Sequence, residues 1–167
     1  MKDFKQLLIK ELNLLPHPEG GYFSETYRSK EIIKKENLPA KYGSDRNYLT
    51  SIYFLLEDNN FSAFHRLKTD EIWYFHFGNP LMLNTIDEQG TLTQNILGPD
   101  FRAGQKFQHT VPAGHWMSAS VLNEEGFSLI GCSMSPGFDY DDFELGDRKK
   151  LIELFPRHKV IIEKYTR

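Results

Sequence analysis

The chain has 167 residues, a formal net charge of −3 and a hydrophobic fraction of 40%, of which aromatic residues make up a large part. This length fits one domain with a substantial core, and the aromatic content excludes a disordered chain. With no basic excess, the sequence gives no support for a nucleic-acid partner.

The cysteine content and the hydropathy pattern narrow the expected location. The single cysteine, Cys132, lies in an apolar run and cannot form an internal disulfide, so we expect a buried, inert thiol. The charged first residues do not resemble a signal peptide, and no apolar run approaches the roughly 20 residues of a membrane span. We therefore expect a cytoplasmic protein with no membrane partner.

The first third of the chain combines a helix, a strand and a loop. Apolar residues in 3–13 recur at helical spacing, which predicts a short amphipathic helix. Two prolines and two glycines in 16–21 predict a turn. Alternating aromatic and polar residues predict a strand at 22–28, and the polar stretch 29–47 predicts a surface loop. We expect the strand at 22–28 to pair with a sheet edge of this chain or of a partner subunit, and we expect a homodimer.

The middle of the chain is a series of short apolar runs separated by turn residues. Eight such runs predict a mainly β fold, an antiparallel sandwich or barrel. The sequence Asp87–Gly90 between two of them predicts a hairpin. The eight predicted strands are 49–56, 61–67, 71–77, 81–86, 91–97, 106–111, 116–122 and 126–134. After them, a helical segment is predicted at about 144–164, so the chain is interpreted as a single domain, 1–167, with a barrel core at about 22–134.

The residues most suited to proton transfer or metal binding lie around the predicted turn at 68–70. Residues two apart on a strand share a face, so Glu71 and Trp73 point the same way, and the turn brings His65 towards them. We expect His65 and Glu71 to meet on one wall of the barrel. A carboxyl group beside an imidazole among aromatic rings suits proton transfer or metal binding.

These residues resemble the motifs of the cupin superfamily. His65, Glu71 and Gly78 resemble the first motif, and the turn at 112–114 resembles the second. Longer strings resemble one branch, the cupin-five family, whose function is unknown: His17–Phe23, Phe64–Arg66, Asp70–Trp73 and Pro136–Leu145. The resemblance implies a double-stranded β-helix, the cupin jelly roll, with short helices at the N- and C-terminal ends, around a small-molecule pocket.

The sequence departs from the metal-binding pattern of cupins. Leu67 and Met117 stand where two histidine ligands are found in metal-binding members. We therefore expect no cofactor. The alternative is a divalent transition metal held by His65, Glu71 and His115, because His115 lies two residues before Met117.

The residues Gly21–Glu25 and Phe64–His65 also resemble those of cupin epimerases that act on nucleotide-linked keto-sugars without a metal. This resemblance implies that His65 is a general base, with Glu71 as its partner and Tyr53 or Tyr27 as the acid. Trp73, Tyr53 and His115 are the expected ligand-binding residues. Three functions stay open: a cofactor-free isomerase or epimerase acting on a carbohydrate-like substrate, a metal-dependent dioxygenase or isomerase, and a non-catalytic binding module.

Overall fold

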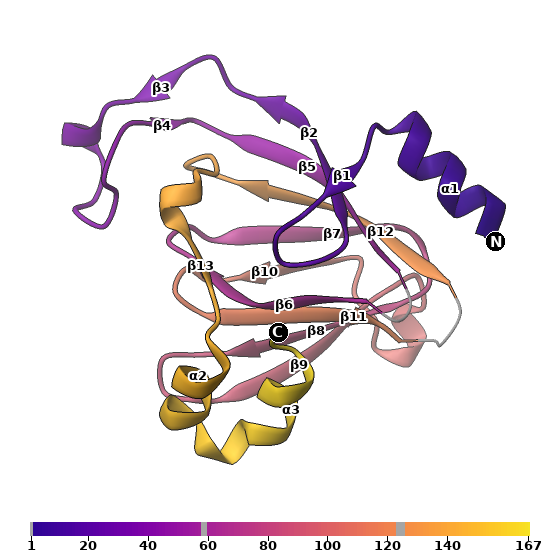
Figure 1. The fold of residues 1–167 in the computed structure, drawn as a ribbon. Coiled ribbons are helices and arrows are strands. Elements are labelled where there is room, and N and C mark those ends of the chain that lie inside the picture. Colours follow the sequence, from indigo (N-terminus) through magenta and orange to yellow (C-terminus); the bar gives the residue numbers. More distant parts are fainter. Residues whose placement is uncertain (1, 58–59, 123–125) are drawn as a thin grey trace.

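The structure is a computed structural model that describes residues 2–57, 60–122 and 126–167, and it is built mainly from strands (Figure 1). Two of the turns predicted from the sequence include residues 58–59 and 123–125, which lie outside the described residues. The helices are α1 (Lys2–Glu11), α2 (Arg148–Leu154) and α3 (Lys159–Lys164). The strands are β1 (Leu15–Pro16), β2 (Tyr22–Arg28), β3 (Ile32–Ile33), β4 (Arg46–Asn47), β5 (Thr50–Glu57), β6 (Phe61–Leu67), β7 (Glu71–Gly78), β8 (Leu81–Ile86), β9 (Leu92–Leu97), β10 (Gln108–Val111), β11 (Trp116–Val121), β12 (Phe127–Met134) and β13 (Phe143–Leu145).

The strands form two facing sheets. One has the order β1-β2-β5-β12-β7-β10, and the other has the order β13-β6-β11-β8-β9. All pairs of strands within these sheets are antiparallel, and the hairpin predicted at Asp87–Gly90 joins β8 to β9. The predicted double-stranded β-helix with terminal helices is confirmed. Hydrogen bonding between the described strands leaves the two sheets separate, so they do not close into one continuous cylinder.

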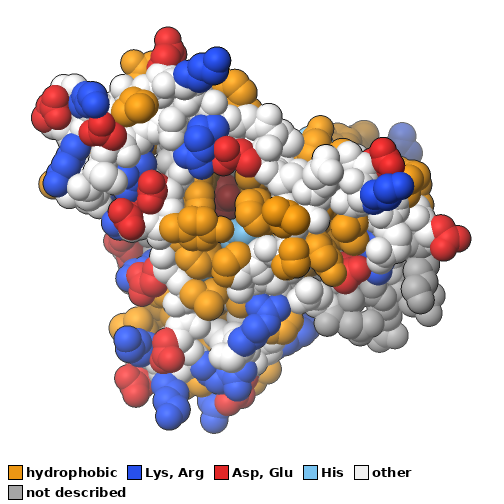
Figure 2. Space-filling view, turned by 45° about the horizontal axis from the view of Figure 1, so that its top comes forward, with side chains coloured by type: hydrophobic (Ala, Val, Ile, Leu, Met, Phe, Trp, Pro, Cys, Tyr) orange, Lys and Arg blue, Asp and Glu red, His pale blue; other side chains and the backbone are white. Residues whose placement is uncertain are grey.

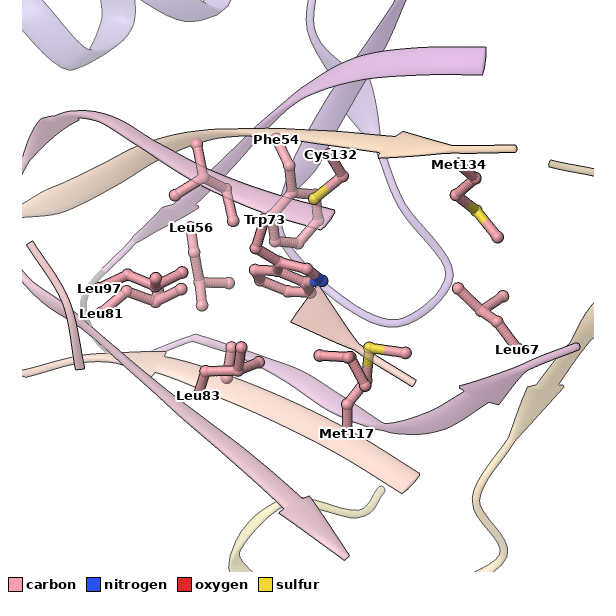
Figure 3. Close-up of a cluster of buried hydrophobic side chains, with 13 residues drawn as sticks. Phe54, Leu56, Leu67, Trp73, Leu81, Leu83, Leu97, Met117, Cys132 and Met134 are labelled. Atoms are coloured by element: carbon pink, nitrogen blue, oxygen red, sulfur yellow. The ribbon is translucent and has the colours of Figure 1, made fainter. Parts of the chain in front are cut away.

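Side chains from both sheets fill the space between them. The largest buried cluster contains 13 residues, including Phe54 and Leu56 from β5, Trp73 from β7 and Met117 from β11 (Figure 3). The ring of Phe54 meets that of Trp73 edge to face, with centroids 6.1 Å apart. This packing holds the inner faces of the two sheets in fixed positions, and the side chains of the site extend from them.

Helices cover both outer faces. Apolar residues of α1 pack over Leu55 and Leu129 on the outer face of the six-stranded sheet. Leu151 of α2 and Ile162 of α3 pack with Phe64 of β6 on the outer face of the five-stranded sheet. No helix in the described part of the chain is long and apolar enough to cross a membrane.

The stretch 29–47, predicted as a surface loop, contains a small arm in which β3 pairs with β4. Arg46 fixes this arm: its guanidinium donates two hydrogen bonds, of 2.6 and 2.7 Å, to the buried carboxylate of Asp142. Asp142 is therefore buried, whereas its neighbours Asp141 and Glu144 are exposed. The preceding strand, β2, pairs with β5 of the same chain.

Candidate functional site

A cavity of about 380 Å³ lies between the two sheets, and its lining includes His65, Glu71 and Trp73. Figure 2 shows the opening as a hollow ringed by hydrophobic side chains, with acidic and histidine side chains visible inside it. Its volume is within the range of small-molecule sites, which are typically apolar clefts with a few polar groups. The structure thus brings together three of the residues that the sequence singles out.

His65 is held rigidly in its place on β6. Its side chain is buried, its ring stacks on that of Phe143 with centroids 5.4 Å apart, and its Nδ1 lies 2.8 Å from the carbonyl oxygen of Ala63. A carbonyl oxygen only accepts hydrogen bonds, so Nδ1 carries a proton. Burial lowers the pKa of His65, and the nearby charge of Glu71 opposes this effect. In the neutral ring, Nε2 is therefore the basic nitrogen.

The partner that faces this nitrogen is Glu19, which the sequence reasoning missed. Oε2 of Glu19 lies 3.2 Å from Nε2 of His65 and 3.4 Å from Nδ1 of His17. Oε1 of Glu19 accepts a hydrogen bond of 2.7 Å from Ser62. Burial raises the pKa of Glu19, which favours a carboxyl group that shares a proton with the imidazole. Glu19 and His65 can thus hold one proton between them.

The loop that carries His17 and Glu19 depends on two glycines. Gly20 and Gly21 have φ values of +115° and +70°. A Cβ atom at Gly21 would lie 2.7 Å from the carbonyl oxygen of Leu55. Only glycine allows the loop to approach the sheet this closely. The run of turn residues at 16–21 predicts a turn correctly, but it gives no sign that the turn brings Glu19 to the cavity.

Glu71 lies at the start of β7, in the sheet opposite His65. Its Oε2 accepts a hydrogen bond of 2.7 Å from Nε1 of Trp73. Burial raises its pKa from the ordinary value of 4.5 to about 7, and the charge of Glu19 acts in the same direction, while His65 opposes it. Burial, with a contribution from Glu71, also raises the pKa of the Cys132 thiol. Because β6 and β7 belong to different sheets, the sequence-based placement of His65 and Glu71 on one wall is wrong: the two groups line the cavity from facing sheets.

Two of the expected ligand-binding residues lie elsewhere. Tyr53 is next to Phe54 on β5, and since alternate residues face opposite sides, it points to the outer face, where its ring meets His76 at 5.7 Å. Tyr27, the other proposed acid, is exposed and is not part of the cavity lining. His115 directly precedes β11, and it does not line the cavity either.

The residues present do not fit the metal site that metal-binding cupins would imply. Leu67 and Met117 are buried in the apolar core, and His115 is outside the cavity, so the set of His65, Glu71 and His115 does not form. Within the described residues, no group of three or more His, Cys, Asp or Glu side chains is arranged to hold a metal ion.

The mouth of the cavity carries a tightly held arginine. Nε and Nη2 of Arg28 donate hydrogen bonds to the carboxylate of Glu25, at 2.7 to 3.2 Å. Nη1 donates to Oδ1 of Asn47 at 2.8 Å and to the carbonyl oxygen of Phe138 at 3.1 Å. The guanidinium is thus engaged within the protein, and its charge is balanced by Glu25.

The fold and the cavity between its sheets define this chain as a cupin. More closely, residues 6–146 match the model of the family described as cupin superfamily (DUF985), and the chain belongs to that family.

Relatives of the chain are found in distant organisms. The uncharacterized protein YML079W of Saccharomyces cerevisiae is 33% identical over 147 residues, which are 82% of this chain and 72% of that protein. The crystal structure of protein SO0799 from Shewanella oneidensis has a TM-score of 0.87 and 40% identity, over 99% of this chain and 96% of that one. A hypothetical protein from Leishmania major has a TM-score of 0.87 and 38% identity, over 96% of this chain and 97% of that one.

A more distant likeness is to oxalate decarboxylase from Bacillus subtilis. The two structures align with a TM-score of 0.54 and 18% identity. The aligned region covers 90% of this chain but 36% of the decarboxylase chain. This likeness supports the fold alone.

Proposed function

We propose that this chain binds a small carbonyl compound, the class to which keto-sugars belong, and moves a proton on it as an isomerase or epimerase. The observation that carries the proposal is the position of Glu71, a buried carboxyl group that faces the cavity, with a pKa of about 7. General acid–base catalysis is most efficient when the pKa of the group lies near the working pH. At neutral pH about half of the Glu71 side chains would be ready to accept a proton and half to donate one.

The groups on the two facing sheets suggest how the proton moves. Glu71 accepts the proton from the carbon next to the substrate carbonyl, and the electrons of the C–H bond pass to the carbonyl oxygen as an enolate forms. That oxygen takes the proton held by the Glu19–His65 pair. Glu71 then returns a proton to the former carbonyl carbon while the hydroxyl group on the neighbouring carbon gives its proton to the Glu19–His65 pair, which yields the isomer and restores both groups; an epimer requires the returned proton to reach the opposite face of the original carbon. Every group that accepts or donates a proton to the substrate in this scheme is a side chain of the cavity.

Hydrogen–deuterium exchange tests the proposal even while the substrate is unidentified. The purified protein is incubated in D₂O with hydroxyacetone, dihydroxyacetone, glyceraldehyde, aminoacetone and common hexoses, and deuterium on carbon is measured by mass spectrometry. We expect protein-dependent exchange in at least one compound, and a loss of about 100-fold or more in Glu71→Gln. His76→Asn is the matched control, because His76 lies on the outer face, and it should exchange as the wild type does. A compound that binds in the cavity and gains no deuterium would contradict catalysis and support a binding module.

The homodimer and the cytoplasmic location expected from the sequence remain proposals. One feature supports the dimer: among the strands that the structure describes, β1 pairs with the outer edge of β2 at Tyr22 and Phe23 alone, and the rest of that edge could pair with a second copy. Light scattering should give twice the mass of the chain at micromolar concentration, and a monomer there would refute the dimer.

A further inference from the structure

Aromatic rings line much of the cavity. Six of its lining residues are aromatic, namely Phe23, Phe54, Trp73, Phe138, Tyr140 and Phe143. Three of these rings contact one another: the centroids of Phe138 and Tyr140 are 5.0 Å apart, and that of Phe143 lies 6.5 and 6.3 Å from them. The face of an aromatic ring carries partial negative charge, which attracts cations and repels anions.

The charged groups of the cavity favour the same kind of ligand. Four carboxyl groups line it, those of Glu19, Glu25, Glu71 and Asp139, whereas Arg28 is the one Arg or Lys among the described lining residues. Since Arg28 already donates to Glu25, Asn47 and Phe138, it offers little to an anion. Burial lowers the pKa of both His17 and His65, so these rings add no stable positive charge.

Glu71 makes the preference unequal between cations and anions. To balance a bound cation, Glu71 has only to lose its proton. Because its pKa is about 7, this loss costs little free energy at neutral pH. An anion there would need a protonated His65, which burial opposes. The other titratable groups facing Glu71 are Glu19 and Cys132, and neither supplies a positive charge.

We propose that the cavity binds an organic cation, a small molecule whose protonated or quaternary nitrogen lies against the aromatic rings and is balanced by the carboxylate of Glu71. The inference rests on the proposed function for the place of the ligand and deepens it, because it makes the substrate an amino-substituted carbonyl compound. Sugar nucleotides, whose phosphates are anionic, are then excluded as substrates.

Three probes of nearly equal shape test the charge preference: choline, its neutral analogue 3,3-dimethylbutan-1-ol, and the anion 3,3-dimethylbutanoate. Isothermal titration calorimetry at pH 7 should show that choline binds at least about tenfold more tightly than the alcohol, the size of one desolvated cation–π contact, and that the anion binds weakest. Titrations in phosphate and in Tris should differ in heat, because Glu71 releases protons to the buffer when choline binds.

Two variants locate the effect. Glu71→Gln should lose the proton release and weaken choline roughly tenfold while leaving the affinity for the alcohol unchanged. His76→Asn should match the wild type in all three titrations. If choline does not bind, or binds no better than the alcohol or the anion, the inference is overturned.

The outcome is separable from that of the proposed function. Choline has no carbonyl group and cannot undergo the exchange reaction, so its binding reports on the charge preference alone. Deuterium exchange into neutral or anionic compounds, with no preference for choline in the titrations, would leave the proposed function standing and refute the organic-cation ligand.

Discussion

Replacing Glu71 with glutamine should change how stability depends on pH. In the folded protein the pKa of Glu71 is about 7, compared with an ordinary value of 4.5. Below pH 4.5 the group is protonated in both the folded and the unfolded chain, and it has no effect. As the pH rises to 7, the unfolded chain loses this proton more readily, so the wild type becomes less stable, and the decline ends above pH 7. The difference in pKa corresponds to about 3 kcal/mol.

Glutamine is a neutral mimic of the protonated acid, and its carbonyl oxygen can still accept the hydrogen bond from Trp73. The variant should therefore lack the decline: relative to the wild type, its free energy of unfolding should be about 3 kcal/mol higher at pH 8 than it is at pH 4. Urea denaturation followed by circular dichroism at both pH values measures this. A relative change below about 1 kcal/mol would mean that Glu71 is solvated and does not exchange protons near neutral pH.

Two further substitutions and one labelling experiment test the parts that support the cavity. Asp142→Asn leaves the buried Arg46 without its counter-charge and should lower the free energy of unfolding by about 3 kcal/mol in urea denaturation, whereas a loss below about 1 kcal/mol would show that water reaches the pair. Gly21→Ala places alanine at a positive φ and brings its Cβ atom against the carbonyl oxygen of Leu55, so we expect the free energy of unfolding to fall by about 2 kcal/mol or more in the same assay. An unchanged denaturation midpoint would refute the close packing of this loop. Cys132, buried and with a raised pKa, should react with a thiol reagent only after denaturation, and rapid labelling of the native protein would contradict its burial.

The strands were predictable from the sequence because short apolar runs and turn residues are local signals. The eight predicted strands agree with β5 to β12 within two residues at each end, and the predicted helix at 3–13 corresponds to α1. The alternation that places Glu71 and Trp73 on the inner face also holds. It fails towards the end of β7, where a change of register opposite Leu129 and Ile130 leaves Phe77 exposed.

The rest of the site was not predictable, for separate physical reasons. The run around Tyr53 is apolar at almost every position, so alternation of polarity cannot show which of its residues face inward. His115 lies before its strand begins, where strand alternation does not apply. Glu19 reaches His65 through a loop that is distant in sequence, and only the folded chain brings the two together.

In the proposed mechanism, the cavity holds a carboxyl group that exchanges protons at neutral pH beside a neutral imidazole. Carbon-13 NMR of the Glu71 carboxyl group, assigned by its loss in Glu71→Gln, tests this directly when followed from pH 4 to 9. We predict a midpoint near pH 7 for this carboxyl group, with His65 neutral and protonated at Nδ1 in nitrogen-15 spectra at pH 7. A carboxyl group that titrates near its ordinary value of 4.5, or an imidazole that stays positively charged at pH 7, would show that Glu71 and His65 cannot act as proposed.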